Sequence, residues 1–285
     1  MYKMTDRNML SSLVTSRQNP TVKRLCALLD KKARRRERAF RFDGIKLLCE
    51  AVQKGVEIEL IALCESADAS VKNKVISLVE SGFVGEDTIL YVSEQVFEKI
   101  SEESSPEGVI TVAKFISSKH KTLENAEDYI LSGSERLLIA ESLRDPGNLG
   151  TVIRSSAALG IDRLIVTDDC ADLYNPKTVR AAMGGLFTLN VDIVKCEELP
   201  ALITRLRSLG RKIYATAFTE NAKKIGSFSL SAGDAFVIGN EGHGLSRAVI
   251  DASDEVALIP MTEGSESLNA AAAAAICIWE TVRSK

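Results

Sequence analysis

The stretch Ile238-Gly239-Asn240-Glu241-Gly242-His243-Gly244 closes an apolar run in the C-terminal half of the chain. Two other stretches share its character: Asp145-Pro146-Gly147-Asn148-Leu149-Gly150, which leads into Arg154, and Ile259-Pro260-Met261, which is followed by Ser267-Leu268-Asn269. Each looks like a polar loop at the end of an apolar strand. In α/β sheets, the loops that leave the carboxyl ends of the strands converge, and ligands bind there. The three stretches together predict one composite site.

The C-terminal half, residues 134–285, alternates apolar strands with helices. We predict strands at Leu137–Ala140, Arg163–Thr167, Leu189–Val194, Lys212–Ala217, Ala235–Ile238 and Val256–Ile259, and helices at Leu149–Leu159, Pro176–Gly184, Leu199–Leu209 and Leu268–Thr281. The strands are apolar on successive residues, which is typical of strands buried on both faces of a parallel sheet. The predicted fold class is therefore α/β, with a doubly wound C-terminal domain.

A smaller α/β domain is predicted at residues 1–115. Its helices fit Pro20–Asp30, with Asn19 as the expected N-cap, and Gly44–Lys54. Its strands fit Ile58–Leu63, Ile89–Tyr91 and Gly108–Ala113. Residues 116–133 lose clear periodicity and are expected to form the linker between the two domains.

The composition indicates a globular protein in a reducing compartment. Of 285 residues, 45% are hydrophobic and 26% charged, enough for two cores. No apolar run approaches the roughly 20 residues that span a bilayer, and Met1–Asn19 lacks the apolar core of a signal peptide. The six cysteines include no C-x-x-C pair, and with two histidines no metal site is expected. We expect a cytoplasmic protein without a membrane segment.

A basic stretch distinguishes the N-terminal domain. Between Arg17 and Arg41, ten Lys and Arg residues stand against two acidic ones, a balance of +8 in a chain whose net charge is −3. A positive stripe on an acidic protein suggests a face that meets a polyanion, and a solvated helix face is the alternative. In combination with the C-terminal site, the stripe favours nucleic acid as the partner.

The first loop has a structural and a functional interpretation. Pro146-Gly147 makes a turn, and Asn148 can cap the helix that follows. Arg154 lies six residues beyond Asn148, and we expect it to emerge on a similar side of that helix. The simpler interpretation is an N-cap followed by a surface arginine.

The other two loops are equally ambiguous when each is taken alone. Glycines around Glu241 permit a close approach of the backbone to a ligand, and His243 is expected to be loop filler. Ser267 and Asn269 can cap the alanine-rich helix or hold a ligand at its N-terminus. The glycine spacing matches neither a P-loop nor the G-x-G-x-x-G of a dinucleotide fold.

In this order, the motifs Asn148…Arg154, Ile238–Gly242 and Ile259-Pro260-Met261 with Ser267-Leu268-Asn269 closely resemble the three motifs of SpoU/TrmH-type RNA 2′-O-ribose methyltransferases, in the SPOUT superfamily. The resemblance covers the C-terminal half. The N-terminal part, with Ser16–Lys23 and Phe42-Asp43-Gly44, resembles the small RNA substrate-binding domain of that family. The family fold implies a trefoil knot in the C-terminal domain and a homodimer.

The resemblance implies S-adenosylmethionine as the cofactor and methyl transfer to a ribose 2′-hydroxyl of structured RNA, with ribosomal RNA favoured. The implied cofactor-binding residues are Gly239, Asn240, Gly242, Ile259 and Leu268. The implied catalytic residues are Asn148, Arg154, Glu241, Ser267 and Asn269. The expected RNA contacts are Arg17, Lys23, Arg34, Arg35, Arg36 and Arg180.

Arg154 matches the family arginine that is proposed to act on this hydroxyl. Because the pKa of a guanidinium exceeds about 12, we favour a role in stabilising the developing alkoxide or in clamping a phosphate, and proton abstraction stays open. The alternatives are a transfer RNA ribose methyltransferase and a non-catalytic RNA-binding protein on the same fold. A nucleotide-dependent dehydrogenase is a distant option, because its phosphate-binding fingerprint is missing.

Overall fold

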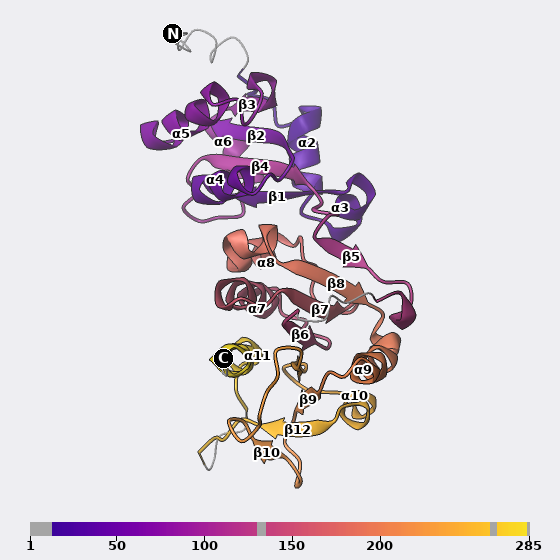
Figure 1. Cartoon of the computed structure of the whole chain (residues 1–285). Helices are drawn as coiled ribbons and strands as arrows, with labels where there is room; N and C mark the ends of the chain where they lie inside the picture. Colours follow the sequence, from indigo (N-terminus) through magenta and orange to yellow (C-terminus); the bar gives the residue numbers. More distant parts are fainter. Residues whose placement is uncertain (1–12, 130–134, 263–266, 284–285) are drawn as a thin grey trace. The chain divides into compact units, whose positions relative to one another are not determined.

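The chain divides into two compact units (Figure 1). The structure, a computed structural model, describes residues 13–129, 135–262 and 267–283. The first unit comprises Met1–Ile116 with Tyr174–Pro176, and the second comprises Ser117–Leu173 with Lys177–Lys285. The polar N-terminal stretch that bears on a signal peptide lies mostly outside the described residues.

The first unit is built on a four-stranded sheet with the order β1-β4-β2-β3. Strand β4 runs antiparallel to β1 and β2, whereas β2 and β3 are parallel. The strands are β1 (Ala39–Asp43), β2 (Ile58–Cys64), β3 (Ile89–Val92) and β4 (Val109–Lys114). The helices are α2 (Pro20–Ala27), α3 (Lys31–Glu37), α4 (Ile45–Gln53), α5 (Ala69–Glu80) and α6 (Glu94–Ile100), with a 3-10 turn η1 (Glu86–Thr88).

The helices of the first unit begin where the sequence provides caps. Asn19 accepts a hydrogen bond from the backbone N–H of Thr21 at 2.8 Å, and Pro20 occupies the first turn of α2, as predicted. Asp30 caps α3 in the same way. The sequence pattern does not reveal β1, because the fully buried Arg41 stands among its apolar residues. This guanidinium is satisfied internally, since it donates to the Leu25 carbonyl at 3.2 Å and to a carboxylate within β1.

The second unit is built on an eight-stranded sheet in which every neighbouring pair is parallel. The order is β10-β12-β9-β11-β6-β7-β8-β5. The strands are β5 (His120–Thr122), β6 (Leu137–Ala140), β7 (Arg163–Thr167), β8 (Asn190–Val194), β9 (Ile213–Thr216), β10 (Lys223–Lys224), β11 (Ala235–Ile238) and β12 (Glu255–Leu258). The predicted α/β class with a parallel C-terminal sheet is confirmed, and the trefoil knot stays a prediction.

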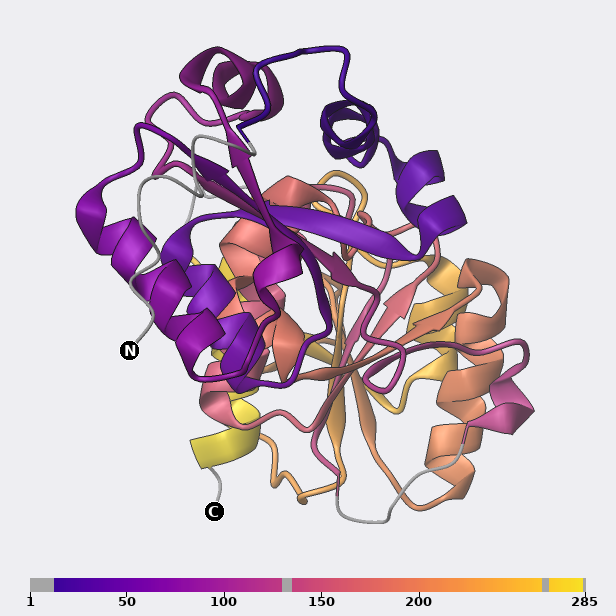
Figure 2. The same ribbon diagram turned by 90° about the horizontal axis from the view of Figure 1, so that it is seen from above.

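Helices cover both faces of this sheet (Figures 1 and 2). On one face, α9 and α10 pack over a core that includes Leu137, Ile139 and Val237. On the other face, α11 packs against α7 and β11. The helices are α7 (Pro146–Leu159), α8 (Pro176–Ala182), α9 (Leu199–Ser208), α10 (Arg247–Ala252) and α11 (Ala270–Arg283), with 3-10 turns η2 (Ala126–Asp128), η3 (Met183–Phe187) and η4 (Cys196–Glu198).

The stretch 116–133, which the sequence suggests as a linker, contains β5 and η2. Because β5 pairs in parallel with β8, this part of the stretch belongs to the sheet of the second unit. Residues 130–133 lie outside the described part of the chain. A strand of three residues is too short to announce itself through periodicity.

The described helices and the cysteines bear on the environment of the chain. No helix in the described ranges is long and apolar enough to cross a membrane. All six cysteines are free, and three of them are buried: Cys64, Cys170 and Cys277. Burial raises the pKa of the Cys170 thiol to about 11, so this side chain stays protonated near neutral pH.

His120 lies in the edge strand β5, and its Nε2 atom lies 3.1 Å from the carbonyl oxygen of Leu186. Burial lowers the pKa of His120 from 6.5 to about 4, although this hydrogen bond acts in the opposite direction. The ring is therefore neutral near pH 7 and donates through Nε2 to the carbonyl.

We expect His120 to make the folded state less stable as the pH falls from 6.5 toward about 4. In this range the histidine of the unfolded chain binds a proton that the folded chain does not bind, so acid favours unfolding. His120→Gln keeps an N–H donor and does not titrate. Calorimetry at a series of pH values should show a smaller decrease of the midpoint temperature for this variant, and equal decreases in both proteins would contradict the assignment.

Candidate active site

A cleft of about 510 Å³ opens beside the carboxyl ends of β9, β11 and β12. Its walls come from the loops that follow these strands and from the beginning of α11. All five residues that the sequence suggests for cofactor binding line it: Gly239, Asn240, Gly242, Ile259 and Leu268. The convergence of loops at the carboxyl edge of the sheet is the arrangement that the sequence predicts.

Asn148 joins the three loops through its side-chain amide. Its Nδ2 donates to Glu241 Oε1 at 2.9 Å, and its Oδ1 accepts a hydrogen bond from Asn269 Nδ2 at 2.9 Å. Asn269 also caps α11, because its Oδ1 accepts from the backbone N–H of Ala271 and Ala272. Glu241 and Ser267 line the cleft itself. Four of the five suggested catalytic residues therefore gather at one place.

Asn240 organises the glycine-rich loop after β11. Its Oδ1 accepts hydrogen bonds from the backbone N–H of Gly242 and of His243, and its own backbone pairs with Gly244. The glycine at position 239 is required by this tight turn, since a Cβ there would lie 2.4 Å from the carbonyl carbon of Gly244. The exposed His243 contributes its backbone to the loop, in line with its expected role as filler.

Ser142, which follows β6, anchors this loop and was not suggested by the sequence. The Nδ2 of Asn240 donates to the Ser142 carbonyl at 2.7 Å. Ser142 adopts a left-handed conformation with φ +55°, and its hydroxyl donates to Asp169 at 2.6 Å. Its backbone N–H donates to the Thr167 hydroxyl at 2.8 Å. A serine gives no sequence signal of a positive φ, whereas its place directly before the Asp145–Gly150 motif is a usable clue.

Arg154 does not join this cluster, and the expectation that it emerges on a similar side as Asn148 is wrong. Six residues advance a helix by about 600°, which leaves the two side chains about 120° apart. Arg154 is exposed, does not line the cleft, and makes no hydrogen bond or ion pair within the described residues. Its Cα lies close to Gly185, where a Cβ would be 3.2 Å away.

Gly150 explains how α7 and α8 approach each other. A Cβ at this position would lie 2.5 Å from the Thr178 carbonyl oxygen and 2.6 Å from the Cβ of Ala181. Glycine is therefore needed for the close packing of the two helices. Arg180 lies on the exposed side of α8, and Ala182 is buried.

Within the basic stretch of the first unit, Arg34 is not available for RNA, which corrects its suggested role. Its side chain is 1% exposed, and its guanidinium donates to the carbonyls of Leu28 and Leu29 at 2.9 and 2.7 Å. It thus satisfies carbonyls at the end of the turn that links α2 to α3. Arg24 is likewise engaged, because it pairs with two carboxylates, those of Glu37 and Glu59.

The other suggested RNA contacts of the first unit lie at the surface. Lys23 and Arg35 are exposed, and Arg36 is exposed beside a carboxylate at 3.3 Å. Arg17 is exposed and donates to the Gln95 carbonyl at 3.3 Å. The exposed cations of this stretch are thus fewer than the sequence count of ten suggests.

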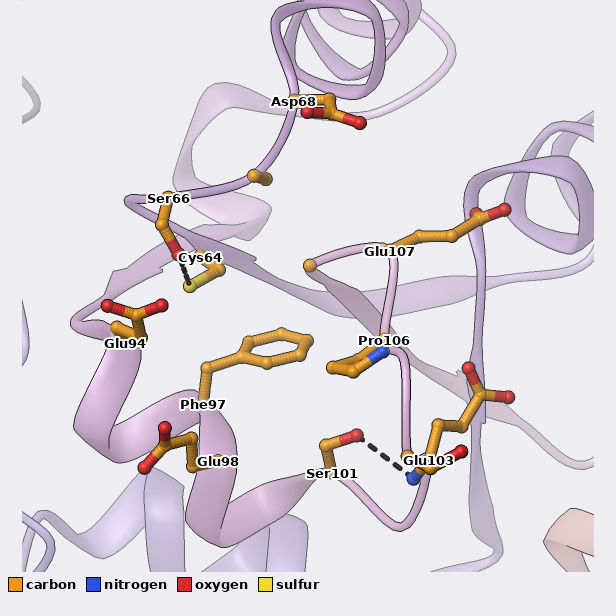
Figure 3. A pocket seen from close by; sticks show the side chains of 13 residues that line it. Cys64, Ser66, Asp68, Glu94, Phe97, Glu98, Ser101, Glu103, Pro106 and Glu107 are labelled. Atoms are coloured by element: carbon orange, nitrogen blue, oxygen red, sulfur yellow. Dashed lines mark hydrogen bonds between the residues drawn. The ribbon is translucent and has the colours of Figure 1, made fainter.

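A second hollow, of about 500 Å³, lies in the first unit (Figure 3). Its floor includes the buried Phe97 and Pro106, and carboxylates surround it: Asp68, Glu94, Glu98, Glu103 and Glu107. Such a rim repels phosphate groups. This hollow is therefore not a surface for the RNA backbone.

The cleft of the second unit has the opposite character. Within the described residues that line it there is no lysine, arginine or histidine, and Glu241 is the one charged side chain. Three apolar side chains of the lining are solvent-exposed: Phe218, Met261 and Leu268. No group of three metal-ligating side chains occurs in the described part of the chain. Backbone groups, apolar side chains and missing cations suit a nucleoside-like ligand without phosphates.

A parallel α/β domain with such a cleft at its carboxyl edge belongs to the class of group-transfer enzymes that use an adenosyl cofactor. The model of the SpoU rRNA methylase family matches residues 135–279, and the model of the MRM3-like substrate-binding domain matches residues 19–111. The chain belongs to the SpoU rRNA methylase family. It is therefore an S-adenosylmethionine-dependent RNA methyltransferase, as the three motifs predict.

Two relatives and one solved structure illustrate the similarity. The chain is 30% identical over 267 residues to the 23S rRNA (guanosine(2553)-2′-O)-methyltransferase RlmP of Bacillus subtilis, which covers 93% of this chain and 97% of that protein. It is 37% identical over 142 residues to a 23S rRNA (uridine(2479)-2′-O)-methyltransferase of Streptomyces viridochromogenes, about half of each chain. The AdoMet-bound rRNA methyltransferase from Sinorhizobium meliloti is 28% identical, with a TM-score of 0.78 over 95% of this chain and 97% of that one.

We expect Gly239→Ala to weaken binding of S-adenosylmethionine roughly tenfold or more, because the new Cβ forces the Gly239–Gly244 turn apart. Isothermal titration measures this change. Gly233→Ala is the matched control, since its Cβ would meet nothing closer than Arg211 Cγ at 3.5 Å. Wild-type affinity in the Gly239 variant would contradict the proposed tightness of the turn.

Proposed function

We propose that this protein methylates a ribose 2′-hydroxyl of ribosomal RNA, and that it acts as a homodimer. The observation that carries the proposal is the hydrogen-bonded group of Glu241, Asn148 and Asn269 beside a cleft without cations. The names of the relatives support ribosomal RNA over transfer RNA. The free cysteines support a reducing compartment, and we propose the cytoplasm.

The lining of the cleft fits S-adenosylmethionine. This cofactor carries a sulfonium and an amino group, one carboxylate and no phosphate. Phosphates would require lysine, arginine or a helix N-terminus, whereas a sulfonium is compatible with a lining whose charged side chain is the carboxylate of Glu241. Leu268 and Met261 offer apolar surface for the adenosyl group, and the backbone of Gly239 and Gly242 offers hydrogen-bonding groups.

The chain then has to orient and activate the ribose hydroxyl. When bound, the cofactor supplies an electrophilic methyl carbon. Asn148 is held in one orientation by Glu241 and Asn269, and together they fix the loops that surround the ribose. Ser267 donates a hydrogen bond to the ribose or the cofactor. Arg154 stabilises the negative charge that develops on the 2′-oxygen as the proton leaves.

Arg154 reaches the site from a second copy of the chain. In its own chain it is exposed and does not line the cleft, and it lies on α7, which packs against α11. The outer side of α11 carries two exposed apolar side chains one turn apart, Ile276 at 38% and Trp279 at 57% exposure. A homodimer that covers this stripe is consistent with the known preference of apolar patches for interfaces.

The test is methyl transfer to total RNA from a strain that lacks the protein, followed by mapping of the labelled nucleotide. We expect label at a ribose of ribosomal RNA. Arg154→Ala should lower kcat by about 100- to 1,000-fold, the usual effect of removing one electrostatic stabiliser, while the affinity for S-adenosylmethionine stays unchanged. Label in transfer RNA, or an equal loss of cofactor binding in the variant, would contradict this assignment.

Co-expression of Arg154→Ala with Asn269→Ala tests the contribution of a second copy. Each variant alone should be inactive. In mixed dimers one cleft combines an intact Asn269 with an intact Arg154 of the partner, so about a quarter of all sites should recover. An inactive mixture that still forms dimers in gel filtration would place both residues in the same chain, and a monomer would refute the dimer.

Replacing Arg35 and Arg36 with alanine should weaken RNA binding and reduce the salt slope of log K by about 1 to 2, the value for one or two phosphate contacts. Fluorescence anisotropy with a ribosomal RNA transcript at several salt concentrations measures this. Arg34→Met is the contrasting variant: it should lower the free energy of unfolding by on the order of 1–3 kcal/mol, because two carbonyls lose a charged donor, and leave the slope unchanged. An unchanged slope in the double variant would assign these cations to solvent.

A further inference from the structure

Phe218 is a phenylalanine ring presented to solvent at the wall of the cleft. It is 85% exposed, the highest value among the large apolar side chains of the described residues. Phe218 lies in the loop directly after β9 and lines the cleft together with Gly239 and Leu268. Leaving such a ring in water costs roughly 2 kcal/mol relative to burial, so its exposure at a ligand site calls for a function.

The backbone on either side of the ring is anchored. The N–H of Ala217 donates to the Ala257 carbonyl at 3.2 Å, which ties the loop to β12. Beyond the ring, the N–H of Ala222 donates to the Thr219 carbonyl at 3.1 Å and closes a turn. Strand β10 then pairs with β12. Phe218 therefore projects from a loop that is fixed at both ends.

The cofactor does not account for this ring. A group held within the cleft is enclosed by the loop backbone and by Leu268 and Met261, which are 40% and 37% exposed. Phe218 is twice as exposed as either of them and contacts what approaches the cleft from solvent. The substrate ribose must come from that side, because the methyl group has to reach a hydroxyl on a separate molecule.

We propose, on the basis of the proposed function, that Phe218 is a stacking platform for a nucleobase of the substrate RNA next to the methylated ribose. Unpaired bases of RNA are held in proteins by stacking on aromatic rings, and each base has a face suited to this. An exposed lysine six residues on, Lys224 in β10, adds positive charge on the same loop-and-strand segment. The combination of an aromatic ring and a nearby cation is typical of surfaces that bind single-stranded nucleic acid.

The test uses a fluorescein-labelled single-stranded oligoribonucleotide from the mapped target region, with anisotropy as the readout, so that it does not depend on activity. We expect Phe218→Ala to raise the Kd of the oligonucleotide roughly tenfold or more. Phe218→Trp should keep the wild-type Kd, and Phe218→Leu should not, because leucine is apolar without an aromatic face. The Kd of S-adenosylmethionine, measured by isothermal titration, should stay unchanged in all three variants.

An abasic version of the same oligonucleotide serves as the second probe. The difference between wild type and Phe218→Ala should disappear when the base beside the target ribose is missing. Phe83→Ala is the matched control, because Phe83 is 63% exposed in the first unit and does not line the cleft. Its Kd values should equal those of the wild type.

Three outcomes would overturn the proposal. A loss of cofactor affinity in Phe218→Ala would assign the ring to the cofactor. Full function of Phe218→Leu would show that its apolar surface, and not stacking, matters. Equal Kd values for all variants would leave the ring without a role in RNA binding. A failed methyl-transfer assay with intact stacking would refute the proposed function alone.

Discussion

The side-chain amide of Asn148 is the interaction on which the site depends. It donates to Glu241, 93 residues on, and accepts from Asn269, 121 residues on. Because the two ends of one planar amide are used, a rotation of Asn148 would break both hydrogen bonds. The beginning of α7, the loop after β11 and the beginning of α11 are therefore held in one arrangement. A site assembled from distant segments needs such a common partner.

The end of β6 provides the second constraint. Glu141, which is buried, accepts from the backbone N–H of Ser246 at 2.8 Å, and Ser142 accepts from Asn240. The loop after β11 is thus held near both of its ends by two consecutive residues. The left-handed conformation of Ser142 costs about 1–2 kcal/mol. Its hydrogen bonds to Asp169, Thr167 and Asn240 offset that cost, so the strain persists at the edge of the cleft.

The sequence predicts the parallel sheet well, because strands such as β6 and β11 are buried on both faces and apolar throughout. It fails where a charged side chain is buried or a segment is short. Arg41 hides β1, and β5 has three residues. The loops around Gly239 and Asn269 could be predicted from composition, whereas the direction of Arg154 could not, since it depends on where α7 begins and on what packs against it. Likewise, the burial of Arg34 follows from tertiary contacts with carbonyls and not from its place in a basic run.

The distribution of charge explains why one chain alone does not complete the reaction site. The cleft has no cation within its described lining, which suits the sulfonium cofactor of this family. Yet a 2′-oxygen that loses its proton needs positive charge nearby, because an uncompensated alkoxide in a partly desolvated site is costly. A cation built permanently into the same cleft would repel the cofactor. Arg154 resolves this conflict if it approaches from a neighbouring copy, on the side of the ribose rather than of the cofactor. The separation of the two charges then follows from assembly, and the exposed apolar stripe on α11 is the surface that makes such an assembly favourable.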